Sequence, residues 1–289
     1  MAPTAASLIY VLLLLVVTAV WGWTFVLVKD AVTQYPTLPF LQIRFALAFV
    51  VVAAVVHRLP TRRELQLGAL IGTVLAAGYL TQTTGLAITS PGNAGLITGL
   101  FVVLTPLLNR LFGTPIHWWT WTAVAVSLVG LLMLTGGPSG MNPGDVLVLA
   151  CAVLFALHIV LLGRWSPGTS SASLTMVQLA MCTLLFTVGG TWSLRSPNAS
   201  VWFAIVITGL FASAFAYFVQ TWAQAQISAN RVAIILATEP AWALVAAVVL
   251  AGQRFGAVEA AGAALLIVAI VGHELASLKL EPHGQPASP

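Results

Sequence analysis

Long apolar runs separated by short polar turns are the main pattern of this 289-residue chain. A helix that crosses the hydrocarbon core of a membrane needs about 20 mainly apolar residues. Stretches of this kind occur at Ser7–Val28, Leu38–Val56, Leu67–Ile88, Ala94–Phe112, Trp118–Leu134, Val146–Leu162, Leu174–Trp192, Val201–Trp222, Val232–Leu250 and Val258–Ala276. Their short connections are rich in Gly, Pro, Ser and Asn. We therefore predict an all-α integral membrane protein with ten transmembrane helices.

Composition supports this fold class. Apolar residues make up 60% of the chain and charged residues 6%, whereas a soluble domain has about 25% charged residues. The formal net charge of +4 comes from basic residues scattered at helix ends, so it does not indicate nucleic-acid binding. Cys151 and Cys182 both lie in apolar stretches, which is typical of packing residues rather than of a disulfide.

The two halves of the chain share a pattern. A shift of 138 positions aligns the same residue types in the third and eighth predicted helices: Tyr79, Gln82 and Thr83 with Tyr217, Gln220 and Thr221. Because each half has an odd number of helices, the second half would enter the membrane upside down. Inverted repeats are typical of secondary transporters. We predict repeats at residues 1–137 and 143–280, followed by a disordered tail at 281–289.

The loop charges predict an orientation. If the N-terminus is cytoplasmic, seven of the Lys and Arg residues near helix ends lie inside and three lie outside. Cytoplasmic loops carry the excess of basic residues in membrane proteins. Both termini are therefore predicted to be cytoplasmic.

Glu239 is the only acidic residue near the middle of a predicted helix, and Pro240 follows it. A carboxylate at this depth costs about 2.5–3.5 kcal/mol on insertion scales, and an intramembrane ionisable residue is a functional candidate by default. A proline within a helix leaves a carbonyl without its hydrogen bond. Glu239 could exchange a proton, hold a substrate ammonium group, or pack in its protonated form against the free carbonyl.

Further polar and aromatic residues near the middle of the predicted helices complete a candidate substrate-binding site: Trp21, Tyr79, Gln82, Thr83, Phe101, His158, Tyr217, Gln220 and Trp242. The functional interpretation is the wall of a cavity. The alternative is hydrogen bonding between helices, worth about 0.6 kcal/mol per pair, or simple packing. Arg44 is interpreted as structural, because it lies near the outer end of its helix and can extend toward the surface.

Motifs of enzymes are absent. The sequence has no HExxH, no GxSxG and no P-loop, so neither hydrolysis nor intrinsic ATP drive is expected. It also lacks the deep Lys/Arg cluster that a phosphorylated cargo would need. We expect no cofactor and no metal. The expected partners are a small-molecule substrate and the lipid bilayer, with no nucleic acid; the oligomeric state stays open, and a monomer is compatible with the sequence.

Four segments resemble the EamA-type transporters of the drug/metabolite transporter (DMT) superfamily. They are WGWTFVLVK at 21–29, IRFALA at 43–48, SPGNAGLITGLFVVLTPLL at 90–108, and the Glu-Pro pair at 239–240 after SANRVAIILAT. The resemblance covers residues 7–280, and the branch that looks most similar is the YddG-type exporters of aromatic amino acids.

This resemblance implies ten helices in two inverted halves, with a central cavity lined by the first, third, fourth, sixth, eighth and ninth helices. It also implies export of amino acids or other small metabolites across the bacterial inner membrane by alternating access. A proton-coupled multidrug exporter is the alternative function, and a channel or an intramembrane enzyme would belong to a different class.

Overall fold

The computed structural model describes residues 5–113, 118–135, 141–190, 196–226, 232, 235, 236 and 238–280. This described part of the chain consists of helices and their connections, with no strand. In chain order the helices are α1 (Ala5–Gln34), α2 (Thr37–Val55), α3 (Arg62–Ile88), α4 (Pro91–Thr98), α5 (Phe101–Asn109), η1 (Arg110–Phe112), α6 (Trp118–Thr135), α7 (Pro143–Trp165), α8 (Ser171–Gly189), α9 (Ala199–Ile207), η2 (Thr208–Phe215), α10 (Ala216–Gln224), α12 (Glu239–Val249) and α13 (Ala257–Leu280).

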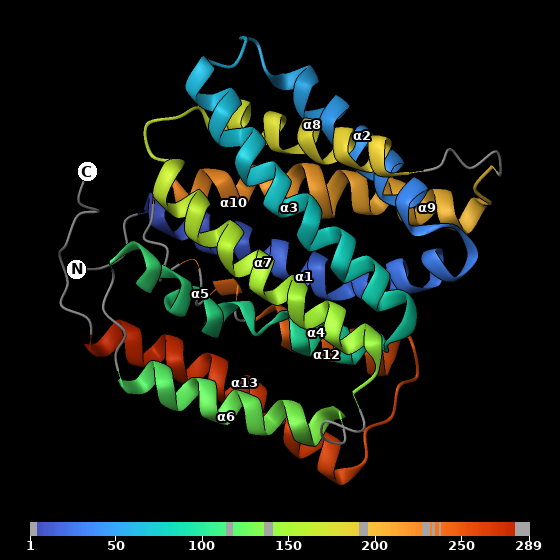
Figure 1. Ribbon diagram of the computed structural model, residues 1–289, viewed down its shortest axis with the longest axis vertical. Coiled ribbons are helices and arrows are strands. Elements are labelled where there is room, and N and C mark those ends of the chain that lie inside the picture. Colours follow the sequence, from blue (N-terminus) through green and yellow to red (C-terminus); the bar gives the residue numbers. More distant parts are fainter. Residues whose placement is uncertain are drawn as a thin grey trace.

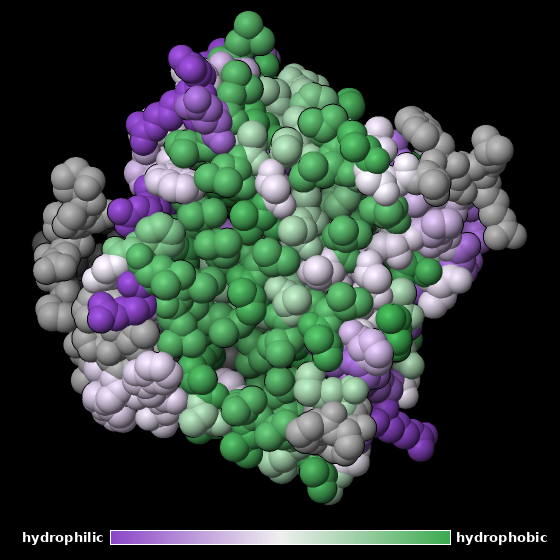
Figure 2. Space-filling model, viewed as in Figure 1, coloured by the Kyte–Doolittle hydropathy of each residue, from purple (hydrophilic) through white to green (hydrophobic). Residues whose placement is uncertain are grey.

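Helical segments of membrane-spanning length dominate the described residues. Seven are long and apolar enough to cross a membrane: Ile9–Gln34, Thr37–Val55, Arg62–Ile88, Pro91–Phe112, Pro143–Trp165, Ser171–Gly189 and Ala199–Gln224. Three apolar helices are shorter: Trp121–Leu134, Glu239–Val249 and Ala257–Ala269. Figure 2 shows apolar residues across the middle of one face, with hydrophilic residues at its left and right margins.

These lengths and this apolar surface define an all-helical, multi-pass membrane protein. The ten-helix count and the inverted repeat stay predictions. The predicted disordered tail at 281–289 lies outside the described residues.

The helices pack as one bundle, in which the most extensive contacts join the first half of the chain to the second (Figure 1). α3 packs against α7 and α8, α2 packs against α8, and α1 packs against α12. α6 and α13 pair with each other at the lower edge of the view. Residues far apart in the sequence therefore face one another in the interior.

Small residues allow α4 and α12 to approach closely. A Cβ atom on Gly95 would lie 2.2 Å from the Cβ of Ala243, and one on Gly99 would lie 2.1 Å from the Cγ of Pro240. Glycine at such contacts is typical of membrane helix packing, where close approach rather than the hydrophobic effect holds helices together. The pair of glycines thus fixes α12 beside the N-terminal half of the broken α4–α5 segment.

Two predicted helices are interrupted in the structure. The stretch predicted as Ala94–Phe112 divides into α4 and α5, with Leu100 N–H bonding to the Ile97 carbonyl and Val102 N–H to the Gly99 carbonyl. These bonds to the third preceding residue tighten the chain locally. The stretch predicted as Val201–Trp222 contains the π-helix η2 between α9 and α10.

Glu239 also differs from its predicted position within a helix. It is the first residue of α12, and Pro240 therefore lies in the first turn. A proline is tolerated there because the first amide groups of a helix have no partner within the helix. Residues 232, 235 and 236 are also helical and Thr238 is in a turn, so Pro240 follows an interruption of the predicted stretch instead of lying within a continuous helix.

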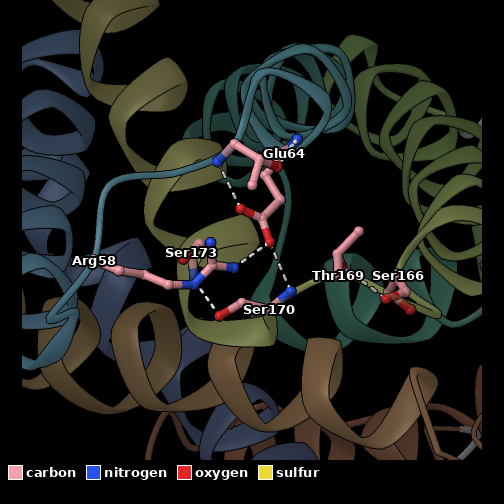
Figure 3. A network of polar contacts seen from close by, with 7 residues as sticks. Arg58, Glu64, Ser166, Thr169, Ser170 and Ser173 are labelled. Atoms are coloured by element: carbon pink, nitrogen blue, oxygen red, sulfur yellow. Dashed lines mark hydrogen bonds and ion pairs between the residues drawn. The ribbon is translucent and has the colours of Figure 1, made fainter.

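A polar cluster ties α3 to α8 at one end of the bundle (Figure 3). The Glu64 carboxylate accepts hydrogen bonds from the backbone N–H of Thr61 at 2.8 Å and of Ser170 at 2.8 Å. It also pairs with Arg58, at 2.5 Å from Nη2 to Oε1. Thr61 caps α3 and Ser170 caps α8, so one carboxylate joins the starts of two helices from different halves of the chain.

Candidate functional site

A central cavity lies among α1, α2, α3, α5, α7, α10 and α12. Eight of the ten predicted site residues line it: Trp21, Tyr79, Gln82, Phe101, His158, Tyr217, Gln220 and Glu239. The volume open to the centres of water-sized molecules is about 40 Å³, which is room for a few waters. A metabolite would therefore need the surrounding helices to separate.

The two predicted repeat-related tyrosines meet in this cavity. The hydroxyl group of Tyr217 donates a hydrogen bond to that of Tyr79 at 2.9 Å, and both side chains are buried. Because α3 places Tyr79 and Gln82 three residues apart, these two side chains share one face of the helix, as do Tyr217 and Gln220 on α10. The pattern that led to their prediction thus also explains their convergence.

The two glutamines have different surroundings. Gln82 donates a long hydrogen bond of 3.3 Å to the hydroxyl of Thr98 on α4. Gln220 donates to Gln224 at 3.0 Å, but its own buried Oε1 has no partner among the described residues. An unsatisfied buried oxygen costs about 1–3 kcal/mol. This cost is avoided when a donor enters the cavity.

Trp21 and His158 hold neighbouring parts of the wall. Trp21 donates from Nε1 to the carbonyl of Ala212, within the π-helix, at 2.9 Å. His158 is buried, with its Nε2 2.9 Å from Oε1 of Gln178 on α8. The His158 ring also meets Tyr217 edge-on, with 5.7 Å between the centroids. A partnered histidine of this kind can orient the wall without binding anything itself.

Thr83 and Trp242 do not line the cavity, which corrects their placement in the candidate site. On α3 the lining positions are Tyr79, Gln82 and Leu86, so Thr83 is turned away from that face and is buried in packing. On α12 the buried face contains Ala243, whereas Trp242 lies at the edge of that face, with its Cβ beside Gly22 of α1 and 38% of its surface accessible.

Arg44 is the main residue whose location the sequence analysis predicted wrongly. Instead of extending to the surface, it is 3% exposed and lines the cavity. Its Nε donates to Ser213 Oγ in η2 at 2.9 Å, and its Nη2 donates to the Tyr79 hydroxyl at 3.3 Å. Its guanidinium carbon lies 4.7 Å from the centre of the Tyr79 ring. The sequence feature that could have identified Arg44 is the location of a charged residue inside a predicted membrane-spanning stretch.

Glu239 faces the same cavity. The residue is 4% exposed, and its carboxyl group has no hydrogen bond or ion pair among the described residues. The ion pair found among the described residues joins Arg58 to Glu64, outside the cavity. A charge without a partner is expensive in a low-dielectric interior. The cavity thus contains one acidic and one basic side chain that do not pair with each other.

Metal binding has no support in the described residues, which contain no group of three or more His, Cys, Asp or Glu side chains placed to hold an ion. The chemistry available is hydrogen bonding, charge and aromatic contact. Together, fold and cavity define a multi-pass membrane protein with an internal polar site, the class to which transporters belong.

The model of the EamA-like transporter family matches the chain twice, at residues 8–136 and 142–273. The chain therefore belongs to the EamA-like transporter family. It is similar to an "Uncharacterized transporter" of Archaeoglobus fulgidus, with 30% identity over 89% of this chain and 83% of the relative. It is also similar to the "Uncharacterized inner membrane transporter YedA" of Escherichia coli K12, with 25% identity over 87% and 86% of the two chains.

A solved crystal structure shares the fold, with a TM-score of 0.69 and 19% identity over 94% of this chain and 99% of that one. Family and relatives point to a transporter rather than an enzyme. They also fit a multi-pass protein of the inner membrane with a small-molecule substrate.

Proposed function

We propose that this protein is a secondary transporter that exports amino acids, chiefly those with aromatic or other apolar side chains, across the inner membrane. The observation that carries the proposal is the central cavity, into which Tyr79 and Gln82 project from one half and Tyr217 and Gln220 from the other. Aromatic residues between these polar groups provide surface for an apolar side chain. Two successive family matches support a duplicated architecture around this site.

The proposed mechanism is alternating access. The cavity has room for only a few waters, so binding of a metabolite requires a conformation in which this space is wider. Movement of one half against the other would open it to each side in turn. We propose that both termini are cytoplasmic, supported by seven basic loop residues on that side against three on the other.

Counterflow in proteoliposomes tests this function. Vesicles preloaded with unlabelled phenylalanine should take up external labelled phenylalanine faster and to a higher transient level than unloaded vesicles. A channel would show no such stimulation, and an enzyme would convert the label into a product separable by chromatography. Absence of counterflow for every member of a panel of amino acids and cationic dyes would overturn the proposal.

A proton-coupled multidrug exporter is the second candidate. The unpartnered, buried carboxyl group of Glu239 favours it, because such a group can take up and release a proton during transport. Counterflow of the dyes without counterflow of amino acids would select this alternative.

A further inference from the structure

We propose that Arg44, together with the hydroxyl group of Tyr79, forms an anion subsite that binds the carboxylate of the transported substrate. The proposal rests on the function proposed above and specifies how the cavity recognises one end of its cargo. It reassigns a residue whose sequence position indicated a structural role.

The first argument is the unused hydrogen-bonding capacity of Arg44. A guanidinium group has five N–H donors in a planar fork, of which Arg44 uses one toward Ser213 and one toward Tyr79. The other three have no partner among the described residues. Because this fork matches a carboxylate in geometry, two parallel bonds can form with one ligand.

The second argument is the absence of a counter-charge. Arg44 is 3% exposed, and no carboxylate of the described residues forms an ion pair with it. Stacking on the ring of Tyr79 offsets part of the cost of burial. A buried charge normally has an opposite charge beside it. An anion supplied from outside would fill that role here.

The third argument is that the surroundings hold Arg44 in place. The Tyr79 oxygen accepts hydrogen bonds from both Arg44 and Tyr217. Its own O–H proton is therefore free to point at a further acceptor. Ser213 fixes the other side of the guanidinium from within the π-helix η2. Irregular helical turns of this kind are frequent at functional sites, and here the turn supplies the residue that positions Arg44.

Binding of four related probes to the purified protein in detergent tests the subsite. L-phenylalanine has both charges, 3-phenylpropanoate has the carboxylate alone, phenethylamine has the ammonium alone, and L-phenylalaninamide replaces the carboxylate by a neutral amide. We expect the two carboxylates to bind roughly tenfold or more tightly than their carboxylate-free analogues, because a hydrogen-bonded charge pair is lost in the latter. Equal binding of phenylalanine and phenylalaninamide would overturn the proposal.

Variants of Arg44 test whether this residue is the one that binds the carboxylate. Arg44→Gln should weaken phenylalanine and 3-phenylpropanoate binding roughly tenfold or more and leave phenethylamine binding unchanged. Arg44→Lys keeps the charge but not the fork, so it should recover only part of the affinity. Arg58→Gln, outside the cavity, is the matched control and should bind all four probes like the parent. If Arg44→Gln does not fold, the probe series on the parent protein still decides.

The outcome is separable from that of the proposed function. Counterflow of phenylalanine with equal binding of all four probes would retain the transporter and exclude the anion subsite. Carboxylate-dependent binding without counterflow of any panel member would retain the subsite and exclude the transporter. Binding of 3-phenylpropanoate that is equal in the parent and in Arg44→Gln would show that the carboxylate binds elsewhere.

Discussion

Arg44 and Arg58 lie 14 positions apart and have opposite surroundings. Arg58 is half exposed, with 48% of its side chain accessible, and it pairs with the buried Glu64. Arg44 is buried without an acidic partner among the described residues. The end of the bundle where α3 and α8 begin thus supplies both charges of its ion pair. In the cavity, the side chains of Arg44 and Glu239 do not pair with each other, so both remain available to a ligand.

The comparison of these two regions distinguishes residues that stabilise the fold from residues that can bind a ligand. Glu64 forms hydrogen bonds to two helix starts and an arginine, so its contribution is to hold α3 and α8 together. Arg44 and Glu239 stabilise the empty protein poorly, because unpaired charges in an apolar interior cost free energy. Variants of the two regions should therefore change different measurements.

The largest effect is expected for Glu239→Gln. The amide keeps the size of the side chain but cannot carry a negative charge. If Glu239 holds the substrate ammonium group, phenylalanine counterflow should show a half-saturation concentration raised roughly tenfold or more. The melting temperature should stay the same or rise, because an unpaired carboxyl group leaves the interior.

The pattern of loss identifies the role of Glu239. Loss of gradient-driven accumulation with intact exchange of substrate for substrate would indicate proton exchange, because exchange needs no net proton movement. A variant that matches the parent in both assays at about pH 5 to 8 would show that Glu239 only packs, and the comparison would then rest on Arg44 alone.

Some residues of this site could be predicted from the sequence and others could not, depending on what determines the direction of each side chain. Tyr79 and Gln82 could be predicted because helical spacing and the partner pair in the second half both point to one face. The orientation of Arg44 could not be predicted, because it depends on Ser213 in a π-helix that no sequence pattern indicated. Trp242 does not line the cavity, because the orientation of α12 is set by the contact of Ala243 with Gly95. Helices were predictable from local composition, whereas facing directions depend on tertiary packing.

The second largest effect is expected for Glu64→Ala, which removes the centre of the polar cluster in Figure 3. Without the carboxylate, the backbone N–H groups of Thr61 and Ser170 lose their acceptor, which costs about 1–3 kcal/mol for each group that is left unsatisfied. The half-exposed Arg58 also loses its partner, which costs about 0–1 kcal/mol more. The melting temperature in detergent should fall by several degrees, while phenylalanine binding per folded molecule should match the parent.

The matched control for this change is Glu259→Ala. Glu259 is exposed and accepts one backbone hydrogen bond, from Gly256 at 2.7 Å, at the start of α13. Its loss should cost about 1 kcal/mol, as for other helix caps. A decrease in melting temperature no larger for Glu64→Ala than for Glu259→Ala would contradict a role for Glu64 in joining α3 to α8.

The smallest effect is expected for Arg58→Gln. Its side chain is 48% exposed, and an ion pair in contact with solvent contributes about 0–1 kcal/mol. Glu64 keeps its bonds to Thr61 and Ser170 in this variant, so the helix starts stay joined. The melting temperature should fall by no more than a few degrees, and phenylalanine counterflow should match the parent. Arg44→Gln, measured beside it, should show the reverse: near-parental melting, with phenylalanine counterflow that needs a roughly tenfold higher substrate concentration. If Arg58→Gln instead reduced counterflow as much as Arg44→Gln, the distinction between a paired structural arginine and an unpaired binding arginine would fail.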